Sequence, residues 1–222
     1  MTSLYFIINN YKQVIYLTWE HLWIVGLALV IATFIGLPLG MLITRNRELA
    51  RKVIDVANVL MTIPSIALFG LLLPVFSLVG HGLGKVPAVT ALVLYSQLPI
   101  IRNTYTAIQN VPPAVVDAGR GMGMSRWELL KEVQIPMSLP VILAGLRTAA
   151  VMNIGIAAIA AYIGAGGLGV LIQQGIDRVY REMILGGAIL VSLLALVVDG
   201  GMALLESLVT PRGVKIQRQR GR

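Results

Sequence analysis

The sequence contains no cysteine, and this absence excludes disulfides, thiol catalysis and cysteine-ligated metal ions. Charge is also scarce, because only 13% of the residues are Asp, Glu, Lys or Arg, against roughly 25% in ordinary soluble domains. Hydrophobic residues, in contrast, make up 57% of the chain. This composition predicts an integral membrane protein.

Metal-binding and catalytic patterns are missing as well. The two histidines, His21 and His81, have no second ligand at a spacing typical of metal sites. No nucleophile is paired in the sequence with a base and an orienting group, as an enzyme would require. The sequence therefore predicts no metal site, no bound cofactor and no catalytic activity of its own.

Two glycine-containing stretches are similar to nucleotide-binding motifs but do not complete them. Residues 164–169 fit G-x-G-x-x-G, yet they follow a predicted membrane span instead of a strand, so we interpret them as a tight external turn. Gly84-Lys85 is similar to the end of a P-loop. Val79 stands at the position of the first glycine, and Val86 stands at that of the Ser or Thr. The chain thus lacks an ATP site of its own.

Long runs with few charges predict an all-α, polytopic membrane protein with one transmembrane domain over residues 1–222. A spanning helix needs about 20 mainly apolar residues. Residues 1–18 are expected to form a short surface helix before the first span. The five expected spans are about 21–44, 56–80, 86–108, 139–163 and 183–209.

The basic residues predict how the chain is oriented in the membrane. If the N-terminus is outside, 14 of the 18 Lys and Arg residues fall on the cytoplasmic side, as the positive-inside rule requires. The C-terminus and the 110–138 segment are then cytoplasmic. The net charge of +8 comes from short clusters between apolar runs, which indicates membrane orientation and not a nucleic-acid partner.

The 110–138 segment is the one long stretch of mixed polarity between apolar runs. Pro113 can open a helix, since the first helical residue needs no N–H donor, and Gly121 and Gly123 are expected to end it.

A second short helix is expected to follow in the same segment. Ser125 and Glu128 have the spacing of a capping box, which predicts a helix start at Arg126. Pro136 is expected to stop that helix before the next span begins.

The spacing of this segment resembles a cytoplasmic motif of the membrane subunits of bacterial ABC importers, E-A-A, three residues, G, nine residues, I-x-L-P. Residues 117–119, Asp-Ala-Gly, stand for E-A-A, and Gly123 follows after three residues. Residues 133–136, Val-Gln-Ile-Pro, close the motif with conservative changes. Residues 99–105 and 120–124 are similar to the osmoprotectant branch, which takes glycine betaine, carnitine or choline. The similarity extends over nearly the whole chain.

The resemblance implies the type I permease fold of ABC importers and a location in the bacterial inner membrane. It also implies a separate ABC ATPase that binds ATP, a second permease chain in a homodimer or paralogous heterodimer, and an extracytoplasmic substrate-binding protein. Residues 113–136 would couple the ATPase to a translocation path for a small osmoprotectant. The residues expected to contact the ATPase are Asp117, Ala118, Gly119, Gly123, Arg126 and Glu128.

Prolines inside the first three expected spans free backbone carbonyls, which is tolerated where neighbouring helices or a water-filled cavity satisfy them. Polar residues near these prolines favour a translocation path, although ordinary packing kinks are the alternative. The path residues predicted on this basis are Ser65, Tyr95, Ser96, Gln97 and Asn103.

Two charged residues are predicted to meet inside the membrane. At a rise of about 1.5 Å per residue, Arg147 lies about 12 Å and Asp199 about 16 Å from the cytoplasmic ends of their spans. We expect an ion pair between them; the alternatives are that Arg147 extends to the surface or pairs with Glu206.

An ion-gradient-driven secondary transporter or channel is the alternative function. Such proteins place ionisable residues at the membrane midplane, whereas those near these spans lie toward the predicted cytoplasmic half. This distribution favours the importer.

Overall fold

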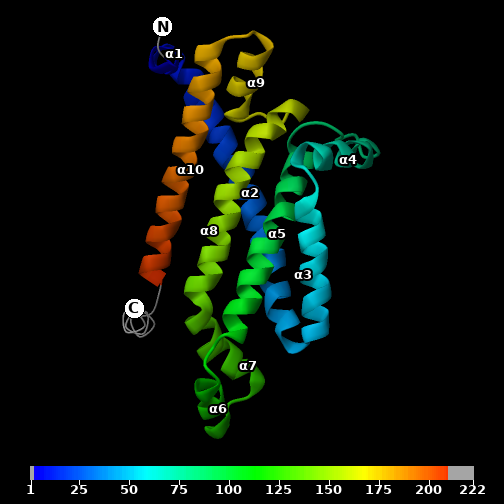
Figure 1. Ribbon diagram of the computed structural model, residues 1–222, viewed down its shortest axis with the longest axis vertical. Helices are drawn as coiled ribbons and strands as arrows, with labels where there is room; N and C mark the ends of the chain where they lie inside the picture. Colours follow the sequence, from blue (N-terminus) through cyan, green and yellow to red (C-terminus); the bar gives the residue numbers. More distant parts are fainter. Residues whose placement is uncertain (1–2, 210–222) are drawn as a thin grey trace.

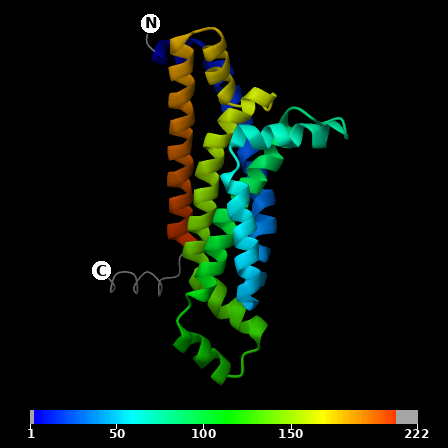
Figure 2. The same cartoon turned by 45° about the vertical axis from the view of Figure 1, so that its right-hand side comes forward.

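The computed structural model describes residues 3–209, and every regular element within that range is helical, as the sequence predicts (Figure 1). Long helices run roughly along one axis, with the segment between α5 and α8 at one end of the molecule. Helix α4 lies across the bundle toward the other end in both views (Figures 1 and 2).

The first long helix begins earlier than the sequence predicts. Helix α1 covers Ser3–Asn9 and α2 covers Tyr11–Leu42, so the expected short helix ends at Asn9 instead of residue 18, and the helix that contains the expected first span starts before residue 21. Polar side chains in the first half of α2 have partners in the folded protein. The Thr18 hydroxyl donates to the Val14 carbonyl (2.7 Å), and the Glu20 carboxylate pairs with Lys85 (2.7 Å).

The second expected span, 56–80, is not a single helix. Helix α3 covers Arg47–Thr62 and α4 covers Ser65–Ser77, and the two meet at 99°. Pro64 causes the break, because it has no N–H to continue the α3 ladder and it holds the preceding residue, Ile63, in an extended conformation (φ −67°, ψ 125°).

Helix α5, Lys85–Gln109, lies in the middle of the bundle and packs against α2, α3, α4 and α8. Its approach to α8, Ile135–Ile159, depends on Gly145, where a Cβ would lie 2.8 Å from the Pro99 carbonyl oxygen. Most residues of α5 are buried by these neighbours, and they include the polar residues Ser96, Gln97 and Thr104, whereas Arg102 is exposed.

The chain after α8 returns along the outside of the bundle. A 3-10 turn at Ala160–Ile163 leads through a glycine-rich loop to α9, Gly169–Asp177, and then to α10, Arg181–Val209. Gly164, Gly166 and Gly167 have positive φ angles, as expected for a tight turn.

Length and apolar composition identify three helical segments within residues 3–209 that are able to cross a membrane, with the bent pair α3–α4 as a possible fourth. They are Tyr11–Arg45, Arg126–Ile163 and Arg181–Val209. Helix α5 is not among them. It lies in the middle of the bundle, and a helix that its neighbours shield from lipid needs less apolar surface. The five-span topology remains a prediction.

Candidate functional site

The loop between α5 and α8 begins as the sequence predicts. Helix α6 covers Pro113–Gly121, with Pro113 at its first position. Gly123 follows with a φ of +85°, and the next N–H, that of Met124, donates back to the Gly119 carbonyl (3.1 Å). This closure of the helix end requires a backbone conformation that glycine adopts readily.

A complete capping box starts the next helix, α7, Arg126–Glu128. The Ser125 N–H donates to the Glu128 carboxylate (2.7 Å), and the Glu128 N–H donates to the Ser125 hydroxyl (3.3 Å). This hydrogen bonding lowers the pKa of the exposed Glu128 carboxyl. The predicted start at Arg126 is therefore correct.

The predicted stop at Pro136 is wrong, because the helix passes through this residue without a break. A π-helical turn at Leu129–Gln134 joins α7 to α8, and the Ile135 N–H donates to the Leu130 carbonyl. This turn is wider than an α-helical turn, so the backbone before Pro136 leaves space for the proline ring. The helix therefore continues through a residue that would otherwise interrupt it. Helices α7 and α8 thus form one continuous helical piece, whereas α6 is separated from them by the turn at Gly123.

Five of the six residues predicted to contact an ATPase are exposed: Asp117, Ala118, Gly123, Arg126 and Glu128. The sixth, Gly119, faces into the loop. A Cβ at Gly119 would lie 2.7 Å from Leu129 Cδ1, so this glycine sets how closely α6 packs against the start of the second helix.

Two large apolar side chains on the same loop were missed by the sequence prediction. Met122 is 77% exposed and Trp127 is 62% exposed. Their exposure in a loop outside the predicted spans is a signal available only once the loop is folded.

The polar residues predicted to line a path do not form one continuous group. Ser96 is buried in α5, where its hydroxyl accepts a hydrogen bond from Asn153 of α8 (2.8 Å). Gln97 is also buried, and its amide donates to the Val93 carbonyl (3.0 Å). Tyr95 donates instead to the Ile63 carbonyl at the α3–α4 bend.

The remaining two path residues lie apart from Ser96. The Asn103 amide donates to the Pro99 carbonyl of its own helix (2.7 Å), and Ser65 is half-buried at the start of α4. Asn153, which the sequence prediction omitted, joins Ser96 because α5 and α8 pack against each other.

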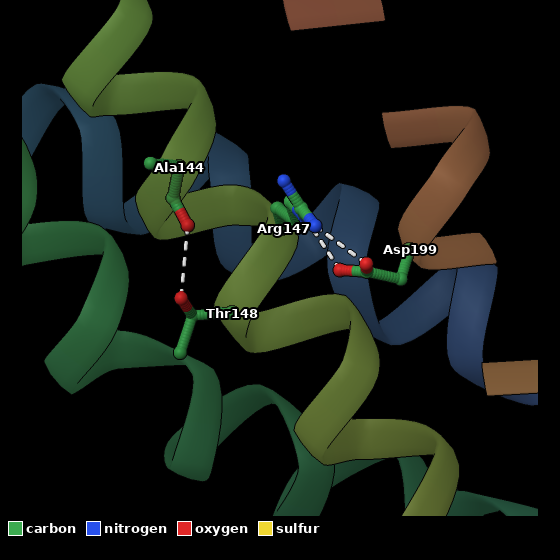
Figure 3. A network of polar contacts seen from close by, with 4 residues as sticks. All are labelled: Ala144, Arg147, Thr148 and Asp199. Carbon is green, nitrogen blue, oxygen red and sulfur yellow. Dashed lines mark hydrogen bonds and ion pairs between the residues drawn. The ribbon is translucent and has the colours of Figure 1, made fainter. Parts of the chain in front are cut away.

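Arg147 of α8 and Asp199 of α10 form an ion pair, as the sequence predicts for these two side chains (Figure 3). The arginine Nε and Nη2 donate to the two carboxylate oxygens, so the pair is bidentate. Each side chain is 35% exposed. The pair lines a hollow of about 580 Å³ together with Ala144, Thr148, Val151 and Met152.

A second polar cluster, also missed from the sequence, ties the glycine-rich loop to α2. The Gly167 N–H donates to the Glu20 carboxylate (2.8 Å), which also pairs with Lys85 at the start of α5 (2.7 Å). The Leu168 N–H donates to His21 Nδ1 (3.2 Å). The neutral tautomer of His21 with its proton on Nε2 then donates to the Ile154 carbonyl (3.1 Å).

Residues 32–211 match the family described as "Binding-protein-dependent transport system inner membrane component". An osmoprotectant import permease protein of Salmonella typhimurium, OsmW, is 52% identical over 97% of this chain and 100% of its own length. A glycine betaine/carnitine/choline transport system permease protein of Bacillus subtilis, OpuCB, is 41% identical over 95% of this chain and 94% of its own.

A solved structure supports the same relationship at the level of the fold. An inward-facing form of the MetNI methionine ABC transporter includes a chain that is 26% identical and superposes with a TM-score of 0.78. The match covers 87% of this chain and 94% of the other.

Proposed function

Because this chain belongs to the family of inner membrane components of binding-protein-dependent transport systems, we propose that it is the permease subunit of an osmoprotectant importer. Its substrate would be a small compound such as glycine betaine, carnitine or choline. The observation that carries this proposal is the 52% identity, over 97% of the chain, with a permease named for osmoprotectant import.

The proposed coupling element is the loop at residues 113–136. An ATPase subunit would bind the exposed face formed by Asp117, Ala118, Gly123, Arg126 and Glu128, with Met122 and Trp127 as apolar contacts. Since α7 continues into α8 without a break, a displacement of this loop would pass directly into α8. The Arg147–Asp199 pair would carry part of that displacement into α10.

The proposed orientation follows from the distribution of basic residues, with the N-terminus outside and the C-terminus and coupling loop in the cytoplasm. The ATPase would then meet the loop on the side where ATP is available. A second permease chain, identical or paralogous, would complete the translocation path, and an external binding protein would deliver the substrate. Ser65, Tyr95, Ser96, Gln97 and Asn103 are proposed to contribute to that path.

The experiment that tests the proposal is uptake by the reconstituted transporter. Proteoliposomes would contain this permease with its ATPase and binding protein, and would be offered radiolabelled glycine betaine, carnitine and choline in turn. We expect saturable uptake of at least one of the three. Failure to take up any of them, in a preparation that hydrolyses ATP, would reject the osmoprotectant assignment.

A further inference from the structure

We propose that the hollow between α8 and α10, with Arg147 and Asp199 in its wall, is a binding site for a small zwitterion that carries a quaternary ammonium group and a carboxylate. The proposal rests on the proposed function, because it assigns the substrate of that importer to a particular place in this chain. The site would hold the compound between its release from the external binding protein and its exit from the transporter.

The geometry of Arg147 leaves part of its guanidinium available to a ligand. A guanidinium has five N–H donors in a planar fork. Asp199 accepts from Nε and Nη2, which lie along one edge of that fork. In Figure 3 the other terminal nitrogen points away from Asp199. A ligand carboxylate can therefore bind this second position while the ion pair stays intact.

The charges around Arg147 favour a ligand with a positive group. Asp199 pairs with the guanidinium directly, and Glu206, further along α10, also interacts with it electrostatically. A cationic head group beside Asp199 would be attracted by its carboxylate, while the carboxylate of the same ligand binds Arg147.

The rest of the wall suits methylated ammonium groups. Ala144, Val151 and Met152 are apolar and line the hollow next to the charges. The Thr148 hydroxyl donates to the Ala144 carbonyl (2.9 Å) (Figure 3), so its hydrogen is already committed within α8. A quaternary ammonium has no N–H to donate and needs only contact surface and a nearby negative charge, which this wall provides.

The partial exposure of the pair is consistent with a ligand site. Each side chain is 35% exposed in this chain, whereas a purely structural pair between two membrane helices is expected to be shielded by protein. A zwitterion adds one charge of each sign, so every charge at the site remains compensated when the ligand enters. A simple anion would add a negative charge without a positive one and would not keep this balance.

The test measures binding to the permease without the external binding protein. The permease–ATPase complex would be placed in lipid nanodiscs and titrated calorimetrically with glycine betaine and, separately, with choline, which has the ammonium but no carboxylate. We expect saturable binding of glycine betaine. Asp199→Asn should weaken both ligands about tenfold or more, as expected for the loss of a charged partner.

A variant of Arg147 distinguishes binding of the ligand carboxylate from binding of its ammonium group. Arg147→Gln should weaken glycine betaine about tenfold or more but leave choline affinity within about threefold of wild type. Glu182→Gln is the matched control, because it removes a carboxylate from the first turn of α10, away from the hollow, and should change neither affinity. Met152→Trp would fill the hollow without altering any charge and should weaken both ligands.

If the charge variants fail to assemble, the Met152→Trp variant still tests whether the hollow binds the ligands. The inference is overturned if the assembled wild-type complex shows no saturable binding, or if the Asp199, Arg147 and Met152 variants bind as wild type does. Uptake assays with the binding protein keep the two proposals distinct. Persistent uptake by complexes without this site would reject the site and leave the importer function standing.

Discussion

Replacing Gly119 by valine should uncouple the permease from its ATPase by pushing α6 away from the second helix of the loop. A Cβ at this position would lie 2.7 Å from Leu129 Cδ1 and 3.2 Å from Met124 Sδ, and Leu129 is buried. Overpacking of this kind costs about 1–3 kcal/mol. Because an isolated short loop has little stability of its own, a cost of this size is expected to displace α6.

The matched control is Gly121→Val, two residues further along the same helix. A Cβ at Gly121 has no heavy atom within 4 Å, so this change adds the same side chain without overpacking. Purified wild-type and variant permeases would be compared for ATPase copurification, substrate-stimulated ATP hydrolysis and hydrogen exchange of the 114–121 amides.

We expect faster exchange and loss of stimulated hydrolysis for Gly119→Val, with near-normal behaviour for Gly121→Val. Equal effects of the two substitutions, or wild-type coupling in Gly119→Val, would refute the view that Gly119 sets the shape of the loop.

Further predictions concern the loop turn, the topology and the ion pair. The Gly123→Arg variant should still insert into the membrane but lose coupling to the ATPase. The Gly123→Asn variant should retain more coupling, because asparagine adopts the φ of +85° more readily than arginine does. Full coupling in the arginine variant would contradict the proposed contact. Because the chain is free of cysteine, single introduced cysteines can be labelled in intact cells with a reagent that does not cross the membrane. A cysteine in place of Gly167 should react and one in place of Ser125 should not. External labelling at position 125 would reject the proposed orientation with the loop in the cytoplasm. Arg147→Asp and Asp199→Arg should each impair assembly and the double swap should restore part of it; a double swap no better than the worse single variant would show that the pair does not support assembly.

Local sequence signals predicted the helix starts and the turn of the 113–136 loop well. Proline at the first position of α6, the glycine turn and the Ser125–Glu128 capping box act through neighbours within about four residues, so their spacing alone carries the information. The family motif in the same segment depends on spacing in the same way. These features required no knowledge of the rest of the fold.

The errors arose where distant contacts or an uncommon helix geometry decide the outcome. The short N-terminal helix was expected to extend to residue 18, but it ends at Asn9 and α2 starts at Tyr11. Glu20 in α2 is paired with Lys85, which lies 65 residues further along the chain and comes close only in the folded bundle. Pro136 was expected to end a helix, but the π-helical turn before it accommodates the proline. A π-helical turn has no simple residue pattern that would reveal it in advance.

In the candidate site, too, some contacts were predictable from the sequence and others depended on the packing of distant helices. The Arg147–Asp199 contact was predictable because helix rise places both residues at similar depths, and unpaired charges are costly in a membrane. The contact between Ser96 and Asn153 was not predictable, since it depends on the relative rotation of α5 and α8. The inward direction of Gly119 likewise depends on how α6 packs against Leu129.

The energy source for transport tests the central claim most directly. Glycine betaine uptake would be measured in proteoliposomes that contain the permease, the ATPase and the binding protein, with ATP or a non-hydrolysable analogue on the side of the ATPase. We predict uptake that requires hydrolysable ATP and the ATPase subunit and that persists when ionophores abolish the ion gradients. Uptake by the permease alone, driven by an imposed ion gradient and independent of ATP, would contradict it.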